Sequence, residues 1–104
     1  MVERMKKLEL ARAFAGMLKD AAAERILLYG SVARGEDTAE SDVNILVLSK
    51  DKRATRKQAL KRAIDVLLDN GTYISVNVLT PGEYEQLRDM HFMRQIRKEG
   101  IVIG

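Results

Sequence analysis

The chain has 104 residues, of which 46% are hydrophobic and 32% charged, and its 18 basic and 15 acidic residues leave a net charge of +3. This composition indicates one globular domain over residues 1–104 and excludes a disordered tail protein, and no apolar run approaches the roughly 20 residues that span a bilayer. The lack of cysteine excludes disulfides, cysteine-ligated zinc, iron–sulfur clusters and thiol catalysis, and with no secretory leader we expect a cytoplasmic protein.

The first half of the chain predicts one helix followed by two buried strands. The helix is expected over residues 3–22, where an apolar stripe at helical spacing comprises Leu10, Phe14, Met17 and Ala21. Short apolar runs at 26–29 and 43–48 are typical of buried strands. The 13-residue loop at 30–42 does not settle whether these two strands are parallel.

The second half predicts a helix at 54–69, a strand at 73–79, a helix from Thr80 to about residue 99, and an edge strand at 101–103. The first of these helices is expected to turn Leu60, Ile64 and Leu67 to one side. Thr80 and Glu83 have the spacing of a capping box at the start of the last helix. Helices alternating with short strands predict an α/β (α+β) domain, with helices covering a small sheet.

The segment GSVARG (residues 30–35) follows the first predicted strand directly. Gly30 lets the backbone turn sharply and approach a ligand closely. Ser31 supplies a hydroxyl group, and backbone N–H groups at such a turn attract phosphate. Arg34 adds a cation on the same side if the turn is helical. Taken alone, a strand followed by Gly-Ser is more often an ordinary loop.

Two oxygen-bearing side chains, Asp42 and Asn44, stand two positions apart where the second strand begins. Side chains at this spacing project from the same face of a strand, beside the Gly30 turn if the two strands are neighbours. Together they could hold Mg²⁺ that bridges to nucleotide phosphates. The alternative is that Asp42 ends a loop and Asn44 is a polar residue of an edge strand.

In combination, GSVARG, a short acidic loop and SDVNILVL resemble the signature of the DNA polymerase beta-like nucleotidyltransferase superfamily, and most closely its minimal nucleotidyltransferase (MNT) domains. The resemblance continues through the following helix, the strand that ends in Thr-Pro, and the Glu-Gly-apolar ending at 99–101. It implies a small mixed sheet covered by helices. It also implies Mg²⁺-dependent transfer of a nucleoside monophosphate, AMP from ATP being the expected case, to an acceptor.

The same resemblance implies roles for individual residues. Gly30 and Ser31 would hold the triphosphate, and an Asp-x-Asp pair at positions 42 and 44 would hold the metal ions. A third carboxylate, at the position that aligns with Asn77, would help deprotonate the attacking hydroxyl. This sequence has Asn44 and Asn77 in two of these positions, and asparagine offers neither charge nor a basic site. With Asp42 alone remaining, we expect nucleotide binding to survive better than turnover.

Two functional hypotheses follow from this family pattern, and one lies outside it. The chain is either a nucleotidyltransferase that retains some activity or an inactive nucleotide-binding or partner-binding module. Many MNT proteins are antitoxins that modify a HEPN-domain toxin, so the resemblance also implies a HEPN-domain partner. A small RNA-binding domain would leave both motifs unexplained. Four nearby acids could replace the missing carboxylates if geometry allows: Glu36, Asp37, Glu40 and Asp65. For Asn77 the alternative is a polar residue on an exposed strand face, with Ser75 on the same side.

Seven basic residues fall within 13 positions: Lys50, Lys52, Arg53, Arg56, Lys57, Lys61 and Arg62. They predict either a patch that attracts nucleic acid or an acidic partner, or a solvated helix face, which we favour. The single histidine, His91, cannot form a metal site alone and is expected at or near the surface. Phe92, Met93 and Ile96 are expected to pack on the sheet or to contribute to a partner surface. A core this small also makes a homodimer plausible.

Overall fold

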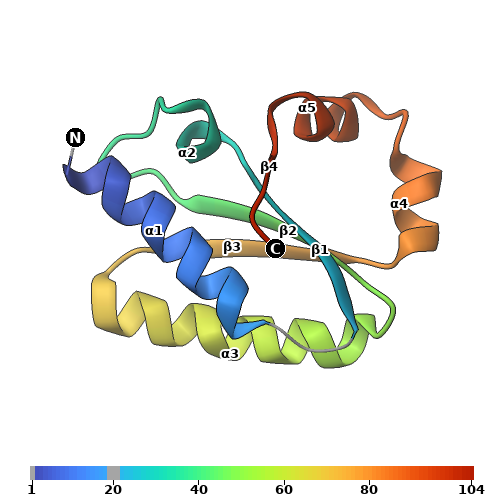
Figure 1. Cartoon of the computed structure of the whole chain (residues 1–104), viewed down its shortest axis with the longest axis horizontal. Coiled ribbons are helices and arrows are strands. Elements are labelled where there is room, and N and C mark those ends of the chain that lie inside the picture. Colours follow the sequence, from blue (N-terminus) through green and yellow to red (C-terminus); the bar gives the residue numbers. More distant parts are fainter. Residues whose placement is uncertain (1, 19–21) are drawn as a thin grey trace.

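The computed structural model describes residues 2–18 and 22–104, which form a mixed four-stranded sheet and five helices (Figure 1). The elements in chain order are α1 (Val2–Met17), β1 (Ala23–Tyr29), α2 (Ser31–Arg34), β2 (Val43–Ser49), α3 (Lys52–Asn70), β3 (Ile74–Leu79), α4 (Pro81–Leu87), α5 (His91–Glu99) and β4 (Ile101–Val102). The predicted fold class is therefore confirmed. None of the helices in these described ranges is both long and apolar enough to cross a membrane.

The strands lie in the order β3-β2-β1-β4, and their directions are mixed. β1 runs antiparallel to both β2 and β4, whereas β2 and β3 are parallel. The parallel pair is joined by α3, as a parallel connection requires a crossover. The loop after β1 therefore returns the chain directly to a neighbouring antiparallel strand, which the sequence alone left open.

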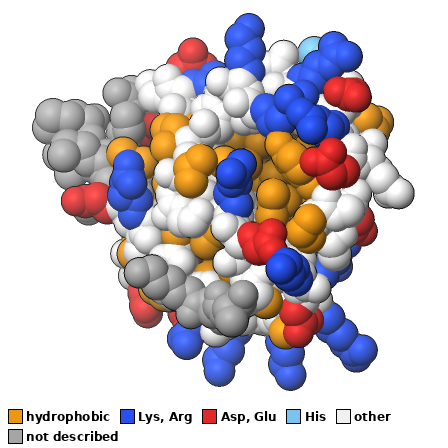
Figure 2. All heavy atoms as spheres, turned by 45° about the vertical axis from the view of Figure 1, so that its right-hand side comes forward, with side chains coloured by type: hydrophobic (Ala, Val, Ile, Leu, Met, Phe, Trp, Pro, Cys, Tyr) orange, Lys and Arg blue, Asp and Glu red, His pale blue; other side chains and the backbone are white. Residues whose placement is uncertain are grey.

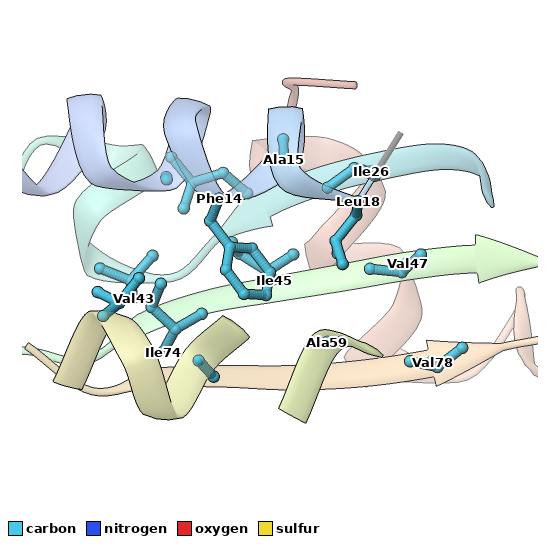
Figure 3. Close-up of a cluster of buried hydrophobic side chains, with 14 of the residues drawn as sticks. Phe14, Ala15, Leu18, Ile26, Val43, Ile45, Val47, Ala59, Ile74 and Val78 are labelled. Carbon is cyan, nitrogen blue, oxygen red and sulfur yellow. The ribbon is translucent and has the colours of Figure 1, made fainter. Parts of the chain in front are cut away.

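One face of the sheet is covered by α1 and α3, and the larger hydrophobic core lies between them and the strands (Figure 3). Its fully buried side chains include Phe14 of α1, Leu18 directly after α1, and Val43, Ile45 and Val47 of β2. From α3, the buried side chains are the small or β-branched Thr55, Ala59, Ala63 and Val66. These small side chains let the helix backbone approach the sheet closely.

The buried face of α3 is not the one that the apolar spacing predicted. Leu60, Ile64 and Leu67 are 50%, 56% and 40% exposed. α3 carries two adjacent apolar stripes, and the stripe of smaller side chains faces the sheet. The spacing of apolar residues cannot show which of two such stripes is buried, because burial depends on the space available against β2 and β3.

The helix α1 is likewise rotated from its predicted orientation. Phe14 is buried as expected and Leu10 packs at the edge of the core, but Met17 is 42% exposed. The buried row instead comprises Lys7, Ala11 and Phe14, and Leu18 directly after the helix continues it. The helix ends at Met17 rather than at residue 22, and the predicted stripe member Ala21 lies outside the described residues.

The second face of the sheet carries a smaller core. Leu27, Tyr29 and Leu46 pack there against Met93 and Ile96 of α5, which confirms that these two α5 residues lie on the sheet. Phe92 is 58% exposed and meets the Tyr29 ring edge-on at a centroid distance of 6.0 Å. The histidine next to it is exposed, as expected, and is visible in pale blue in Figure 2.

The single helix predicted from Thr80 to residue 99 is broken into α4 and α5 at residues 88–90. Its start is as predicted, because the capping box between Thr80 and Glu83 is formed in both directions. The break lets the chain change direction, so that α5 returns over the second face of the sheet and leads into β4 (Figure 1). A straight helix through these residues would not bring Met93 and Ile96 onto the strands.

Candidate functional site

The bend after β1 lies directly against β2. Gly30 has φ 86° and ψ −159°, a conformation that side chains with a Cβ atom rarely adopt. A Cβ atom at this position would stand 2.6 Å from Nδ2 of Asn44. The helical turn α2 then begins at Ser31, and the Arg34 N–H donates to the Gly30 carbonyl oxygen at 3.1 Å. The Gly-Ser turn and Asn44 are therefore neighbours.

Strand register puts the two asparagines on one face of the sheet. Asn44 is opposite Tyr29 of β1 and opposite Ser75 of β3, and Leu46 is opposite Asn77. Residues two apart on a strand share a face, so Asn44, Ser75 and Asn77 project from the same side. This is the face that also carries Tyr29 and the smaller core, opposite to the face covered by α1 and α3.

Asn77 is exposed, and its carboxamide is bound to a neighbouring side chain. Its Nδ2 donates a hydrogen bond to the Tyr29 hydroxyl oxygen at 3.0 Å. Because Tyr29 is on β1 and Asn77 on β3, the tyrosine side chain reaches across β2 to make this bond. An aspartate in place of Asn77 could accept a hydrogen bond from the same hydroxyl, so the position tolerates either residue type.

Asp42 is exposed and immediately precedes β2, at the end of a loop that is held by a residue the sequence did not single out. The Lys7 ammonium donates to the backbone carbonyl oxygens of Thr38, Ala39 and Ser41 at 2.6, 3.1 and 2.7 Å. Lys7 itself is only 3% exposed. The sequence did contain an indication of this role, because Lys7 lies in one helical row with the apolar Ala11 and Phe14. A lysine on a buried helix face requires polar partners.

The Arg34 guanidinium forms ion pairs with two carboxylates. Its guanidinium donates to Oε1 of Glu36 at 2.9 Å and to Oε1 of Glu99 at 3.1 Å, which links α2 to the end of α5. These hydrogen bonds, first to Glu36 and then to Glu99, raise the pKa of Arg34 above its ordinary value. These two hydrogen bonds use only the Nε and Nη1 atoms and hold the guanidinium between α2 and α5.

Two of the four acids considered as substitutes for the missing carboxylates are engaged with arginines. Glu36 is paired with Arg34, and Asp65 lies on α3 beside Arg62 at 3.6 Å, on the opposite side of the sheet. Within residues 2–18 and 22–104, no three acidic or histidine side chains form a cluster that could hold a metal. A single Mg²⁺ that arrives with phosphate oxygens fits one carboxylate and one amide oxygen, here Asp42 and Asn44. A second metal ion does not fit this set of donors.

A cavity of about 500 Å³ opens beside Asn77. Its lining is mainly hydrophobic and comes from β2, β3 and the α4–α5 region, with two cationic residues of α3: Leu46, Lys52, Arg56, Val76, Asn77, Val78, Leu79, Leu87, Met90, Phe92 and Met93. Lys52 is held by both carboxylate oxygens of Glu83 at 3.0 Å. The cavity thus places Asn77, the position where the family resemblance implies a third carboxylate, beside a hydrophobic surface.

The family model of the nucleotidyltransferase domain matches residues 9–103. Among solved structures, a Sulfolobus solfataricus protein described as a nucleotidyltransferase is 20% identical, with a TM-score of 0.61 over 96% of this chain and 81% of that one. A toxin–antitoxin structure with AMP-PNP is 19% identical, with a TM-score of 0.56 over 89% of this chain and 72% of that chain. A mutant of the toxin–antitoxin MntA–HpeT, also 19% identical, gives 0.51 over 97% and 72%. None of the curated proteins compared with the chain matches it significantly.

Proposed function

Because the chain belongs to the nucleotidyltransferase domain family, we propose that it binds ATP with Mg²⁺ at the bend after β1 and transfers AMP slowly to an acceptor hydroxyl, with pyrophosphate as the leaving group. The observation that carries this proposal is the contact between Gly30 and Asn44, which brings the Gly-Ser turn beside a residue two positions after Asp42. Both motifs of the sequence thereby come together where β1 ends and β2 begins. A basic surface domain of another class would not require this convergence.

In this proposal each residue has a distinct role in binding. Gly30 and Ser31 hold the triphosphate by close approach of the backbone and by the serine hydroxyl. Asp42 and Asn44 supply a carboxylate and an amide oxygen to one Mg²⁺. When bound, this ion neutralises phosphate charge and favours the in-line geometry of phosphoryl chemistry. Lys7 supports the site indirectly, because it fixes the loop that leads to Asp42.

Slow transfer follows from the chemistry of Asn77. A general base contributes about 10²–10⁴-fold to a rate, and a carboxamide cannot accept the proton of an acceptor hydroxyl. Its Nδ2 is also engaged by Tyr29. In this site the proton would have to pass to water, and the reaction would proceed without a second metal ion.

We propose further that the acceptor belongs to a HEPN-domain protein and enters through the cavity beside Asn77. Two structural relatives are toxin–antitoxin proteins, one of them with AMP-PNP, which supports an antitoxin role for this chain. The hydrophobic lining of the cavity suits an apolar or aromatic group that carries the acceptor hydroxyl.

An inactive binding module is the second candidate, and one observation favours it. Nδ2 of Asn77 and the Nε and Nη1 atoms of Arg34 already donate to other side chains of the same molecule, which favours a structural role for both residues. In that case the fold would serve to bind a nucleotide or a partner without turnover.

Transfer is tested with ATP labelled on the α-phosphate, Mg²⁺ and a HEPN-domain protein. The wild type should label the partner slowly, and Asn44→Asp with Asn77→Asp should increase the rate by about 10²-fold or more. Asn70→Asp, at the exposed end of α3, is the matched control and should leave the rate unchanged. Labelling in neither protein, with ATP binding intact, would decide for the inactive module.

Binding is tested separately by calorimetry with ATP and Mg²⁺. Asp42→Asn should weaken Mg²⁺-dependent binding at least tenfold, whereas Asp89→Asn, an exposed aspartate between α4 and α5, should have no effect. Absence of any Mg²⁺-dependent binding by the wild type would contradict both the transferase and a nucleotide-binding module, and would leave only the partner-binding role.

A further inference from the structure

The outer surface of α3 carries a hydrophobic row with no partner in the described chain. Leu60, Ile64 and Leu68 follow one another at intervals of four residues, which places them on one side of the helix. They are 50%, 56% and 78% exposed, and Leu67 beside them is 40% exposed. Three large apolar side chains in an exposed helical row exceed the scattered single residues that are normal on a surface.

A charged row runs beside this hydrophobic row and changes sign at its middle. Lys57, Lys61, Asp65 and Asp69 are also four residues apart, and all are exposed. Figure 2 shows basic side chains projecting along the lower edge of the molecule, where Figure 1 places α3. The first turn of α3 contains no acidic residue and the last turn no basic one, the opposite of what the helix dipole favours. This charge order does not stabilise α3 by itself.

We propose that two copies of this chain associate through antiparallel α3 helices about a two-fold axis near Ile64. When the row is turned end to end, each charge meets a charge of the opposite sign. Lys57 and Asp69 lie equally far from the middle of the row, and so do Lys61 and Asp65. In an antiparallel pair, Lys57 therefore faces Asp69 of the second copy, and Lys61 faces Asp65. Both contacts occur twice, as a two-fold interface requires.

The hydrophobic row fits the same arrangement. Ile64 meets Ile64 of the second copy at the axis, and Leu60 of each copy meets Leu67 and Leu68 of the other. The antiparallel helices also bring the positive end of one dipole to the negative end of the next. A nucleic acid would meet Asp65 and Asp69 and leave the leucines exposed, so the surface suits a second copy better.

The interface is small, which sets the affinity that we expect. α3 has 19 residues and is about 28 Å long. A single helix pair of this length buries less than about 1,200 Å², the range of weak and transient complexes. We therefore expect the dissociation constant of the dimer to lie in the micromolar range. Because α3 covers the sheet face opposite to Asn44 and Asn77, the proposed nucleotide site stays open in the dimer.

Sedimentation velocity over a concentration series tests the pairing by charge reversal. The wild type should shift from monomer to dimer as concentration rises. Lys57→Glu with Lys61→Glu, and separately Asp65→Lys with Asp69→Lys, should each weaken association about tenfold or more, because like charges then face each other. The variant with all four substitutions should regain dimerisation, since the complementary order is restored in reverse.

The controls separate association from folding and from nucleotide binding. Arg94→Glu with Lys98→Glu makes the same charge change on exposed positions of α5 and should leave the dimer intact. Circular dichroism should show native helix content in every variant, and calorimetry should show unchanged ATP binding. A wild type that stays monomeric at all concentrations, or a fourfold variant that does not recover, would overturn the proposal. A dimer that persists in both double variants would equally refute α3 as its interface.

Discussion

At the scale of single residues, Lys7 and Gly30 shape the candidate site without carrying its chemistry. Lys7 brings an ammonium group into the interior and binds three carbonyl oxygens of the loop before Asp42. Gly30 adopts a left-handed backbone conformation against the Asn44 side chain. Both residues act on geometry, and neither supplies a side-chain ligand to the nucleotide or the metal in the proposed site.

Lys7→Met should destabilise the protein by about 2 kcal/mol, because the replacement leaves three carbonyl oxygens without their charged donor. The same change should weaken Mg²⁺–ATP binding, since the loop before Asp42 loses its anchor. Urea unfolding and calorimetry measure the two effects. Lys98→Met, at an exposed position of α5, is the control that should change neither. Equal stability of Lys7→Met and wild type would show that these hydrogen bonds contribute little.

Gly30→Ala should cost about 1–3 kcal/mol of stability and reduce ATP affinity, because an alanine is strained at this φ and its Cβ would displace the Asn44 side chain. Gly16→Ala is the matched control, with no atom within 4 Å of the added Cβ. It lies inside α1 and should stabilise the protein by about 0.5–1 kcal/mol. Thermal unfolding of both variants gives the comparison, and a neutral Gly30→Ala would argue against a required bend.

At the scale of elements, the start of α4 shows how local chemistry sets a boundary. The Thr80 hydroxyl accepts from the Glu83 N–H at 3.1 Å, and the Glu83 carboxylate accepts from the Thr80 N–H at 3.0 Å. Lys52 from the start of α3 binds the same carboxylate. The Thr80 backbone hydrogen bond, followed by the Lys52 contact, lowers the pKa of Glu83 below its ordinary value of 4.5. The capping box therefore also joins two helices.

This lowered pKa predicts a pH dependence of stability. A carboxyl group with a depressed pKa in the folded state stabilises the protein above its ordinary pKa, and the contribution is lost as pH falls through the folded value. Glu83→Gln should therefore be less stable than wild type near neutral pH, and the difference should shrink at about pH 3. Urea midpoints at both pH values measure this. A difference that is independent of pH, or equal to that of Glu85→Gln, would contradict the assignment.

At the scale of the whole molecule, the sheet separates two surfaces with different tasks. One face carries Tyr29, Asn44 and Asn77, and the other is covered by α1 and α3, of which α3 reaches the cavity through Lys52 and Arg56 alone. The proposed dimer uses only the outer side of α3. Nucleotide binding and self-association can therefore be altered independently.

Self-association predicts that the melting temperature rises with protein concentration, because a dimer stabilises the folded state by mass action. Ile64→Glu should abolish this dependence, while the melting temperature at high dilution stays close to that of wild type, since Ile64 is 56% exposed. Met90→Glu, at a residue 58% exposed on the opposite side, should retain the dependence. Scanning calorimetry at several concentrations makes the comparison, and a concentration-independent wild type would contradict the prediction.

The sequence alone determined the features that depend on neighbouring residues. The motifs around Gly30 and Asp42 carry the family resemblance. The strands, the capping box at Thr80 and the end of the helix predicted at 54–69 follow from local sequence, and the structure has these elements close to their predicted positions. The roles of Asp42, Asn44 and Asn77 in binding and transfer stay predictions that the proposed assays address.

Only the tertiary structure decided which side chains meet across the sheet. It selected the Ala59 stripe of α3 over the Leu60 stripe, because a helix with small side chains packs more closely on the strands. It also set β1 antiparallel to β2 and brought Asn77 to the Tyr29 hydroxyl. Such choices depend on the shape of surfaces that are distant in sequence, and local spacing carries no information about those surfaces.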